Sequence, residues 1–200
     1  MQKHPKSTDE ERKYCFATTR LIGGLLVGFL IWTISNVWYE KPIHTANMMA
    51  QDIAKLAAIF KQIEKECGIS SFDYQANPIN FLNIKKEGFV GSEVGSMNLA
   101  RPEKWQGPYL QDNLEIQEKD YQVVSTNKGY FIVPGKGVEL PNGKIVGTDI
   151  ILDENADIAA MMHDKDKLMF EDKPLAAPIV TEKTVVNSEF IAVLAHGEGE

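Results

Sequence analysis

The stretch CFATTRLIGGLLVGFLIWTISNVWYEKP, residues 15–42, contains the most apolar run in the chain. From Leu21 to Tyr39 it holds no Asp, Glu, Lys, Arg or His. An α-helix rises about 1.5 Å per residue, and about 20 apolar residues cross the roughly 30 Å hydrocarbon layer of a bilayer. The sequence therefore predicts a membrane-spanning helix over residues 21–39.

Charge around this run predicts its orientation. Glu40 and Lys41 follow it, whereas the residues before it include Lys3, Lys6, Arg12, Lys13 and Arg20. The positive-inside bias places segment 1–20 in the cytoplasm and the chain from about residue 40 outside it. A cleaved signal peptide is the competing interpretation, with Thr33 and Ser35 near a weak cleavage site. The run exceeds a usual h-region and no A-x-A sequence follows, so we favour an uncleaved anchor.

Small residues in the apolar run suggest helix association. Gly24 and Gly28 have the small-xxx-small spacing that lets a second membrane helix approach closely. Many lone anchors contain such pairs, so the spacing supports association only weakly. We expect a helix-packing face at these two glycines.

A second helical pattern follows Pro42, a residue that kinks or starts a helix. Apolar residues recur at spacings of three and four, with polar residues between them, at Met49, Ile53, Leu56, Phe60 and Ile63. This periodicity predicts an amphipathic helix, with Thr45 or Asn47 as its cap and Gly68 as its stop. We expect its apolar stripe to pack on the domain's own core.

The remaining sequence predicts a small antiparallel sheet. Residues 68–104 are rich in Gly, Asn, Ser and Pro and are typical of a long ordered loop. From residue 120, short β-branched and aromatic runs alternate with turn sequences, including Asn142-Gly143, which favours a type I′ hairpin. A short helix is expected within 156–163. The expected class is α+β, with a domain over 40–172 and a linker and tail over 173–200.

Composition excludes several functions. The formal net charge is −7, and no basic stripe lies beyond the first twenty residues, so nucleic acid is not an expected partner. No nucleophile motif is present, and we expect no enzyme. The predicted span separates Cys15 from Cys67, so we expect no disulfide between them.

An aromatic cluster interrupts the loop region in RPEKWQGPYLQDN, residues 101–113. Trp105, Tyr109 and Leu110 surround the turn pair Gly107-Pro108. Burial of these side chains would contribute several kcal/mol, about 1.5–3 kcal/mol for each large one. We interpret the five residues as an anchor that holds the loop to a helix.

Taken in order, these features resemble the major pseudopilin of bacterial type II secretion systems, within the type IV pilin-like superfamily. The resemblance covers residues 16–158. Its most specific parts are WQGPYL at 105–110 and VPGKGVELPNGKIVGTDI at 133–150. It implies a pilin-like fold and a non-catalytic subunit, held in the inner membrane before its N-terminal helix packs in a filament with copies of itself or other pilin-like subunits of the secretion machinery.

The chain departs from that family at its processing site. The family usually has Gly before the new N-terminal Phe and a Glu five residues into the mature chain. Aligned on Phe16, this chain has Cys15 and Arg20 at those positions. An unprocessed, permanently anchored periplasmic module that binds a protein or a metal ion is therefore the alternative hypothesis.

The resemblance also implies a calcium loop. Asp149 matches one of the family's loop aspartates, and Glu139 stands in for another donor. Asp153 and Asp157 are further candidate oxygen donors on this chain's own sequence, although Ile158 occupies the position where an EF-hand needs glycine. Calcium takes six to eight oxygen ligands. Solvated loop carboxylates are the other interpretation of these four residues.

Overall fold

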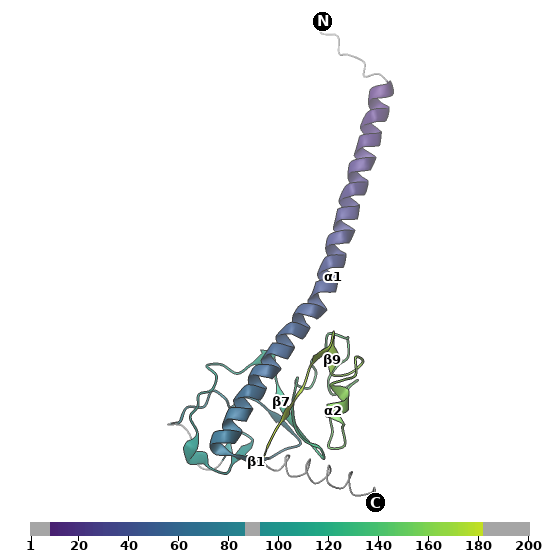
Figure 1. Ribbon diagram of the computed structural model, residues 1–200. Helices are drawn as coiled ribbons and strands as arrows, with labels where there is room; N and C mark the ends of the chain where they lie inside the picture. The colour runs from purple at the N-terminus through teal and green to yellow at the C-terminus, as the bar shows by residue number, and fades with distance from the viewer. Residues whose placement is uncertain (1–8, 87–92, 182–200) are drawn as a thin grey trace, which may run out of the picture. The chain divides into compact units, whose positions relative to one another are not determined.

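The computed structural model describes residues 9–86 and 93–181, with backbone alone for 9–21, 34–40 and 93–94. The chain divides into two compact units, Met1–Pro42 and Ile43–Glu200. Helix α1 runs over Asp9–Cys67 and contains Pro42 (Figure 1). We expected this proline to kink or start a helix. It does not start one, because it lies inside α1, and Thr45 and Asn47 therefore also lie inside α1 and are not caps.

Helix α1 ends where expected. Gly68 has φ +69°, and its backbone N–H donates to the Glu64 carbonyl at 2.9 Å. A residue in the left-handed region with this hydrogen bond is a common helix terminus, and glycine adopts that conformation without a Cβ penalty. The chain then turns into the first strand.

The fold class is α+β, with small antiparallel sheets. The remaining elements in chain order are β1 Ile69–Phe72, β2 Ala76–Pro78, β3 Glu93–Val94, β4 Met97–Leu99, the 3₁₀ helix η2 Pro102–Lys104, β5 Glu115–Ile116, β6 Lys119–Asp120, β7 Gln122–Thr126, β8 Gly129–Val133, α2 Ile158–Met161, β9 Met169–Phe170, β10 Lys173–Pro174 and β11 Ala177–Ile179.

The largest described sheet has strand order β11-β8-β7-β2, and every pair is antiparallel. A second sheet has the order β1-β4-β3, and the hairpins β5-β6 and β9-β10 stand as separate pairs. Segment 68–104, which we expected to be a loop, thus contributes strands to both larger sheets. Segment 173–181, expected to begin a linker, supplies β10 and β11. Residues 182–200 lie outside the described part.

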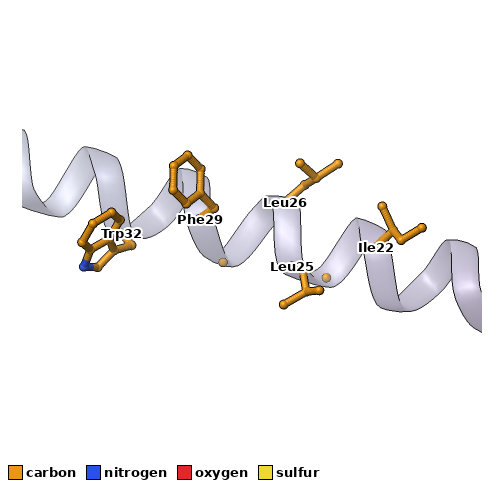
Figure 2. Close-up of a pocket in the computed structure, with 7 residues that line it drawn as sticks. Ile22, Leu25, Leu26, Phe29 and Trp32 are labelled. Atoms are coloured by element: carbon orange, nitrogen blue, oxygen red, sulfur yellow. The ribbon is translucent and has the colours of Figure 1, made fainter.

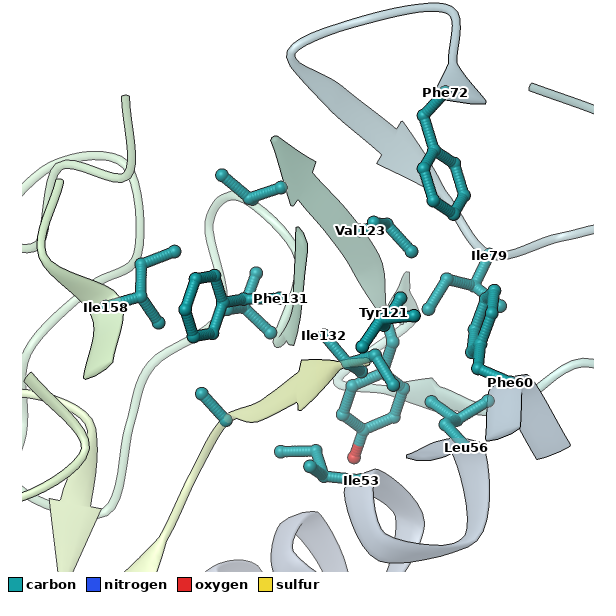
Figure 3. Close-up of a cluster of buried hydrophobic side chains, with 14 of the residues drawn as sticks. Ile53, Leu56, Phe60, Phe72, Ile79, Tyr121, Val123, Phe131, Ile132 and Ile158 are labelled. Atoms are coloured by element: carbon teal, nitrogen blue, oxygen red, sulfur yellow. The ribbon is translucent and has the colours of Figure 1, made fainter. Parts of the chain in front are cut away.

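One core joins α1 to these sheets. The stripe predicted from periodicity is buried, with Met49, Phe60 and Ile63 at 0% exposure, Leu56 at 1% and Ile53 at 2%. Figure 3 shows Tyr121 among Ile53, Leu56 and Ile132, so the residue that precedes β7 packs directly on the helix. Phe60 also meets Phe81 edge-on, with ring centroids 6.4 Å apart.

The Asn142-Gly143 turn differs from the expected type. Gly143 has φ +79°, and Asn142 is not among the residues with positive φ. Gly143 N–H donates to the Leu140 carbonyl at 2.8 Å, and Leu140 N–H to the Lys144 carbonyl at 2.7 Å. This is a three-residue loop with one left-handed residue, not a two-residue type I′ turn, because Pro141 favours the first central position of a type I turn.

Two-residue turns with positive φ at both positions occur elsewhere. In the β5-β6 hairpin they are Gln117 and Glu118, with φ 53° and 59°. In the β9-β10 hairpin they are Glu171 and Asp172, with φ 47° and 61°. Residues with a Cβ are disfavoured in this region, and neither turn has the Asn-Gly sequence that usually predicts a two-residue hairpin. The sequence therefore did not predict these two hairpins.

Candidate helix-packing surface

The first unit presents an exposed apolar face on α1. Figure 2 shows Ile22, Leu25, Leu26, Phe29 and Trp32 projecting from one stretch of the helix. Each of these side chains is between 58% and 67% exposed. They surround a shallow groove together with Gly24 and Gly28. We call this set of seven residues the glycine face.

The two glycines form the low part of the glycine face. A Cβ built on Gly24 or on Gly28 meets nothing within 4 Å. Crowding by the described part of the chain therefore does not explain why glycine occupies these two positions. A helix-interior glycine costs about 1 kcal/mol relative to alanine. Close approach by a second backbone gives a physical reason to retain glycine at both positions.

Polar groups near the glycine face are satisfied locally. The hydroxyl of Thr33 donates to the Leu30 carbonyl at 2.9 Å, so it needs no external acceptor. Phe29 and Trp32 lie with ring centroids 5.8 Å apart. From Leu21 to Thr33 the sequence contains no ionisable side chain. The glycine face is therefore apolar.

The predicted processing residues are placed only as backbone. Cys15, Phe16 and Arg20 fall within α1, but their side chains are outside the described set. Among the residues that the structure describes, no helix has the length and hydropathy that a membrane crossing requires.

The predicted loop anchor is a connected cluster in the second unit. Trp105 is 1% exposed, and its indole N–H donates to the Ile84 carbonyl at 3.1 Å. Tyr109 meets Trp105 edge-on, with ring centroids 4.8 Å apart. Leu110 is 7% exposed, and its backbone N–H bonds the Leu82 carbonyl. These contacts hold the loop against segment 81–84.

The same loop reaches α1 through Tyr109, whose hydroxyl donates to Glu66 Oε2 at 3.2 Å. Burial raises the pKa of Tyr109 well above its usual range. Burial, with the neighbouring Glu66, also raises the pKa of Cys67, a free buried thiol. Within the loop Gly107 is buried and Pro108 is exposed, and a cis peptide bond joins them. The cluster joins the loop to the last turn of α1.

The predicted calcium donors are not brought together. Over residues 9–86 and 93–181, no three His, Cys, Asp or Glu side chains are grouped so as to hold a metal ion. Glu139, Asp149 and Asp153 are exposed. Among the described residues, the expected calcium loop therefore has no cluster of three such side chains.

Local hydrogen bonds explain the positions of three of these carboxylates. Asp149 Oδ2 accepts the Ile145 N–H at 2.8 Å, and Asp153 Oδ1 accepts the Asn155 N–H at 3.0 Å. Asp157 caps α2 through the Ala160 N–H at 3.1 Å and also pairs with Lys128. Its hydrogen bonds to Lys128 and to Ala160 lower the pKa of Asp157. These side chains act as turn and cap residues.

A polar contact that was not predicted from the sequence ties α1 to the sheet. Tyr121 is fully buried, and its hydroxyl donates to Asp52 Oδ2 at 3.0 Å. Burial, reinforced by Asp52, raises the pKa of Tyr121 far above its usual range. Asp52 lies at the border of the apolar stripe, and this position is the one feature of the sequence that could have indicated the contact.

Comparison with protein families, curated proteins and solved structures finds no significant match to this chain.

Proposed function

We propose that the chain is a pilin-like structural subunit, anchored in the bacterial inner membrane, that assembles through the glycine face of α1 with copies of itself or with other pilin-like subunits of a type II secretion or pilus-like machine. Its second unit stands on the periplasmic side, and its role is structural, not catalytic. The observation that carries the proposal is the glycine face itself.

Burial energetics support an environment other than water for this face. Each large apolar side chain contributes about 1.5–3 kcal/mol when removed from water. In a single chain, Leu25, Phe29 and Trp32 remain mostly exposed. Lipid covers such a surface before assembly, and a neighbouring helix covers it afterwards, drawn close by the absence of side chains at Gly24 and Gly28.

The proposed span runs from Leu21 to Tyr39, and the side chains of Leu21 and of residues 34–39 within it are outside the described set. The basic residues before it support a cytoplasmic N-terminus. Trp38 and Tyr39 suit the outer interface, where aromatic side chains are enriched.

The second unit supports the pilin-like part of the proposal. The C-terminal part of α1 packs its buried stripe on small antiparallel sheets, with the aromatic loop anchor at its last turn. A helix that is exposed and apolar early and half-buried later has one part available for assembly and another for holding a head domain.

A permanently anchored periplasmic binding module is the second candidate. Cys15 and Arg20 favour it, because they replace the Gly and Glu used in processing and in subunit register by the family that the sequence resembles. Such a protein keeps its first fifteen residues and does not leave the bilayer for a filament.

Two measurements test these functions. We expect the native chain to resist alkaline extraction from membranes and to dissolve only with detergent; recovery as a soluble monomer contradicts both candidates. The intact mass of the purified protein then separates them. A mature chain beginning at Phe16 supports the filament subunit, and a chain beginning at Met1 supports the permanent anchor.

A further inference from the structure

The second unit contains an open pocket that none of the preceding roles uses. Its volume is about 280 Å³, and it lies beside the turn of the β7-β8 hairpin. Side chains from β1, the β1-β2 turn, the hairpin and the segment before α2 line it. It is separate from the glycine face and from the loop anchor.

Aromatic rings form its apolar part. Phe72 and Tyr130 meet edge-on, with ring centroids 4.9 Å apart. Tyr74 lines the pocket as well and is 67% exposed. An exposed tyrosine beside an aromatic pair offers ring faces to a ligand. Ring faces carry partial negative charge and attract ammonium or guanidinium groups.

One carboxylate supplies formal charge. Glu154 is the sole charged residue among the described residues that line the pocket. Within the described part of the chain, no group donates to its carboxylate. The lysine of the same hairpin, Lys128, is paired with Asp157 instead. The pocket therefore carries a negative charge that has no partner in the described fold.

The polar side chains of the lining present acceptors. Ser125 donates its hydroxyl hydrogen to the Tyr74 carbonyl at 3.3 Å, and Thr126 donates to the Gly129 carbonyl at 3.0 Å. A hydroxyl has one hydrogen to give and an oxygen with two acceptor sites. The Thr126 oxygen already accepts the Lys128 N–H at 3.1 Å and keeps one acceptor site, whereas no group in the described part of the chain donates to the Ser125 hydroxyl.

The two amides of the lining behave similarly. Gln75 donates to the Leu152 carbonyl at 2.9 Å, and Asn127 donates to Asn155 Oδ1 at 3.0 Å. Among the described residues, neither amide oxygen receives a hydrogen bond. Both oxygens add acceptor capacity to that of the hydroxyls.

We propose that this pocket binds an organic ammonium group on an aliphatic stem, the chemistry of a lysine side chain. The stem lies against Tyr74 and Tyr130, and the ammonium hydrogens go to Glu154 and the acceptor oxygens. A bare metal cation does not exploit the rings in this way, and an anion is repelled by Glu154.

Two sources carry this chemistry: a free alkylamine, or a lysine of a second copy of the chain. The exposed residues of α1 from 47 to 65 include Lys55, Lys61 and Lys65 and no acidic residue. A second copy of the chain therefore offers exposed lysine side chains to the pocket. The binding chemistry itself is independent of the proposed anchoring and assembly.

Titration of the detergent-solubilised full chain tests the pocket. The probes are Nα-acetyl-lysine-N-methylamide and its uncharged counterpart Nα-acetyl-norleucine-N-methylamide, followed by NMR of ring-labelled tyrosines. We expect the lysine probe to shift the Tyr74 and Tyr130 signals and to bind at least about fivefold more tightly than the norleucine probe. Equal binding of both probes, or no binding of either, overturns the proposal.

Variants assign that binding to the pocket. Glu154→Gln removes the charge at an exposed position and should weaken the lysine probe about two- to fivefold. Tyr74→Leu should weaken it by a similar factor. Asp166→Asn, an exposed acid outside the pocket, is the matched control and should change nothing. Unaltered binding in both pocket variants contradicts the assignment.

Carbodiimide coupling in membranes identifies the source. An amide between Glu154 and a lysine of another chain, located by mass spectrometry, supports a second copy as the donor. Absence of that amide with lysine-probe binding intact supports a free amine. Failure of the probe titration leaves membrane anchoring unaffected, and a soluble monomeric chain leaves probe binding unaffected, so the two proposals fail separately.

Discussion

Replacing Tyr121 by phenylalanine tests the contact that fastens α1 to the sheet. The substitution keeps the buried ring and removes the hydroxyl that donates to Asp52 Oδ2 at 3.0 Å. A hydrogen bond to a charged group contributes about 1.5–3 kcal/mol. Asp52 is half-buried, so water partly replaces the lost donor. We expect the free energy of unfolding to fall by about 1–2 kcal/mol.

The pH dependence gives this prediction a second signature. The pKa of Tyr121 is raised in the folded state, because burial and Asp52 disfavour the phenolate. The unfolded tyrosine ionises near pH 10, so its stabilising effect is complete below about pH 10 and is lost as pH rises above it. Between about pH 10 and 11 the wild type should lose about 1 kcal/mol more than Tyr121→Phe, because the unfolded tyrosine is only half ionised at pH 10 and the full slope of about 1.4 kcal/mol per pH unit is reached above that range.

Urea unfolding of the full chain in mild detergent, followed by near-ultraviolet circular dichroism, measures both effects. Tyr74→Phe is the matched control, because Tyr74 is 67% exposed and should change stability by less than about 0.5 kcal/mol. Tyr109 is present in every variant, so its own raised pKa cancels in the comparison. If Tyr121→Phe matches the control in stability and in its response above pH 10, the reasoning is wrong.

Two further substitutions test the packing of the second unit. Gly107→Ala places a Cβ in overlap with the Ile84 carbonyl oxygen and should lower the free energy of unfolding by about 1–3 kcal/mol or more. Gly137→Ala, whose Cβ meets nothing within 4 Å but whose φ is +88°, should lower it by about 1 kcal/mol in urea unfolding. Equal losses in the two variants would contradict the overlap. The Asn142 amide donates to two carbonyls in segment 165–167, at 3.0 and 3.1 Å. Asn142→Asp removes this donor and should lower Tm by about 2–8 °C at pH 7. An unchanged Tm would show that these two hydrogen bonds make no net contribution to stability.

The periodicity of apolar residues predicted the buried face of α1 correctly. The stripe from Met49 to Ile63 was predicted from spacing alone and is buried, because a half-buried helix must repeat its apolar residues at the period of its turns. The β7-β8 pair was similarly foreseeable from its β-branched and aromatic residues.

The prolines of segment 173–181 hid its strands. Pro178 lies in β11, an edge strand of the largest described sheet, where a missing N–H is tolerated. Prolines are common in linkers, and the segment was therefore predicted to be one. Burial of Leu175, Ala176 and Ile179 depends on contacts that no local pattern specifies.

The site residues divide along the same line. Trp105 was recognisable because a large aromatic beside a turn has few stable places except a core. Asp149, Asp153 and Asp157 could not be interpreted from sequence, because a turn or cap aspartate and a calcium ligand have the same sequence signature until tertiary structure places the donors. The pocket at Tyr74 joins segments far apart in the chain and has no local signature.

Disulfide crosslinking in native membranes tests the central proposal most directly. In a background without the two native cysteines, the single variants Gly24→Cys and Gly28→Cys are oxidised in turn. Each should form a disulfide-linked dimer with a second copy of itself or with another pilin-like subunit. Val27→Cys and Leu30→Cys, which do not line the groove of the glycine face, should crosslink much less. Dimers confined to the two glycine positions are the predicted result; no crosslink at any position, or equal crosslinking at all four, would contradict assembly through this face.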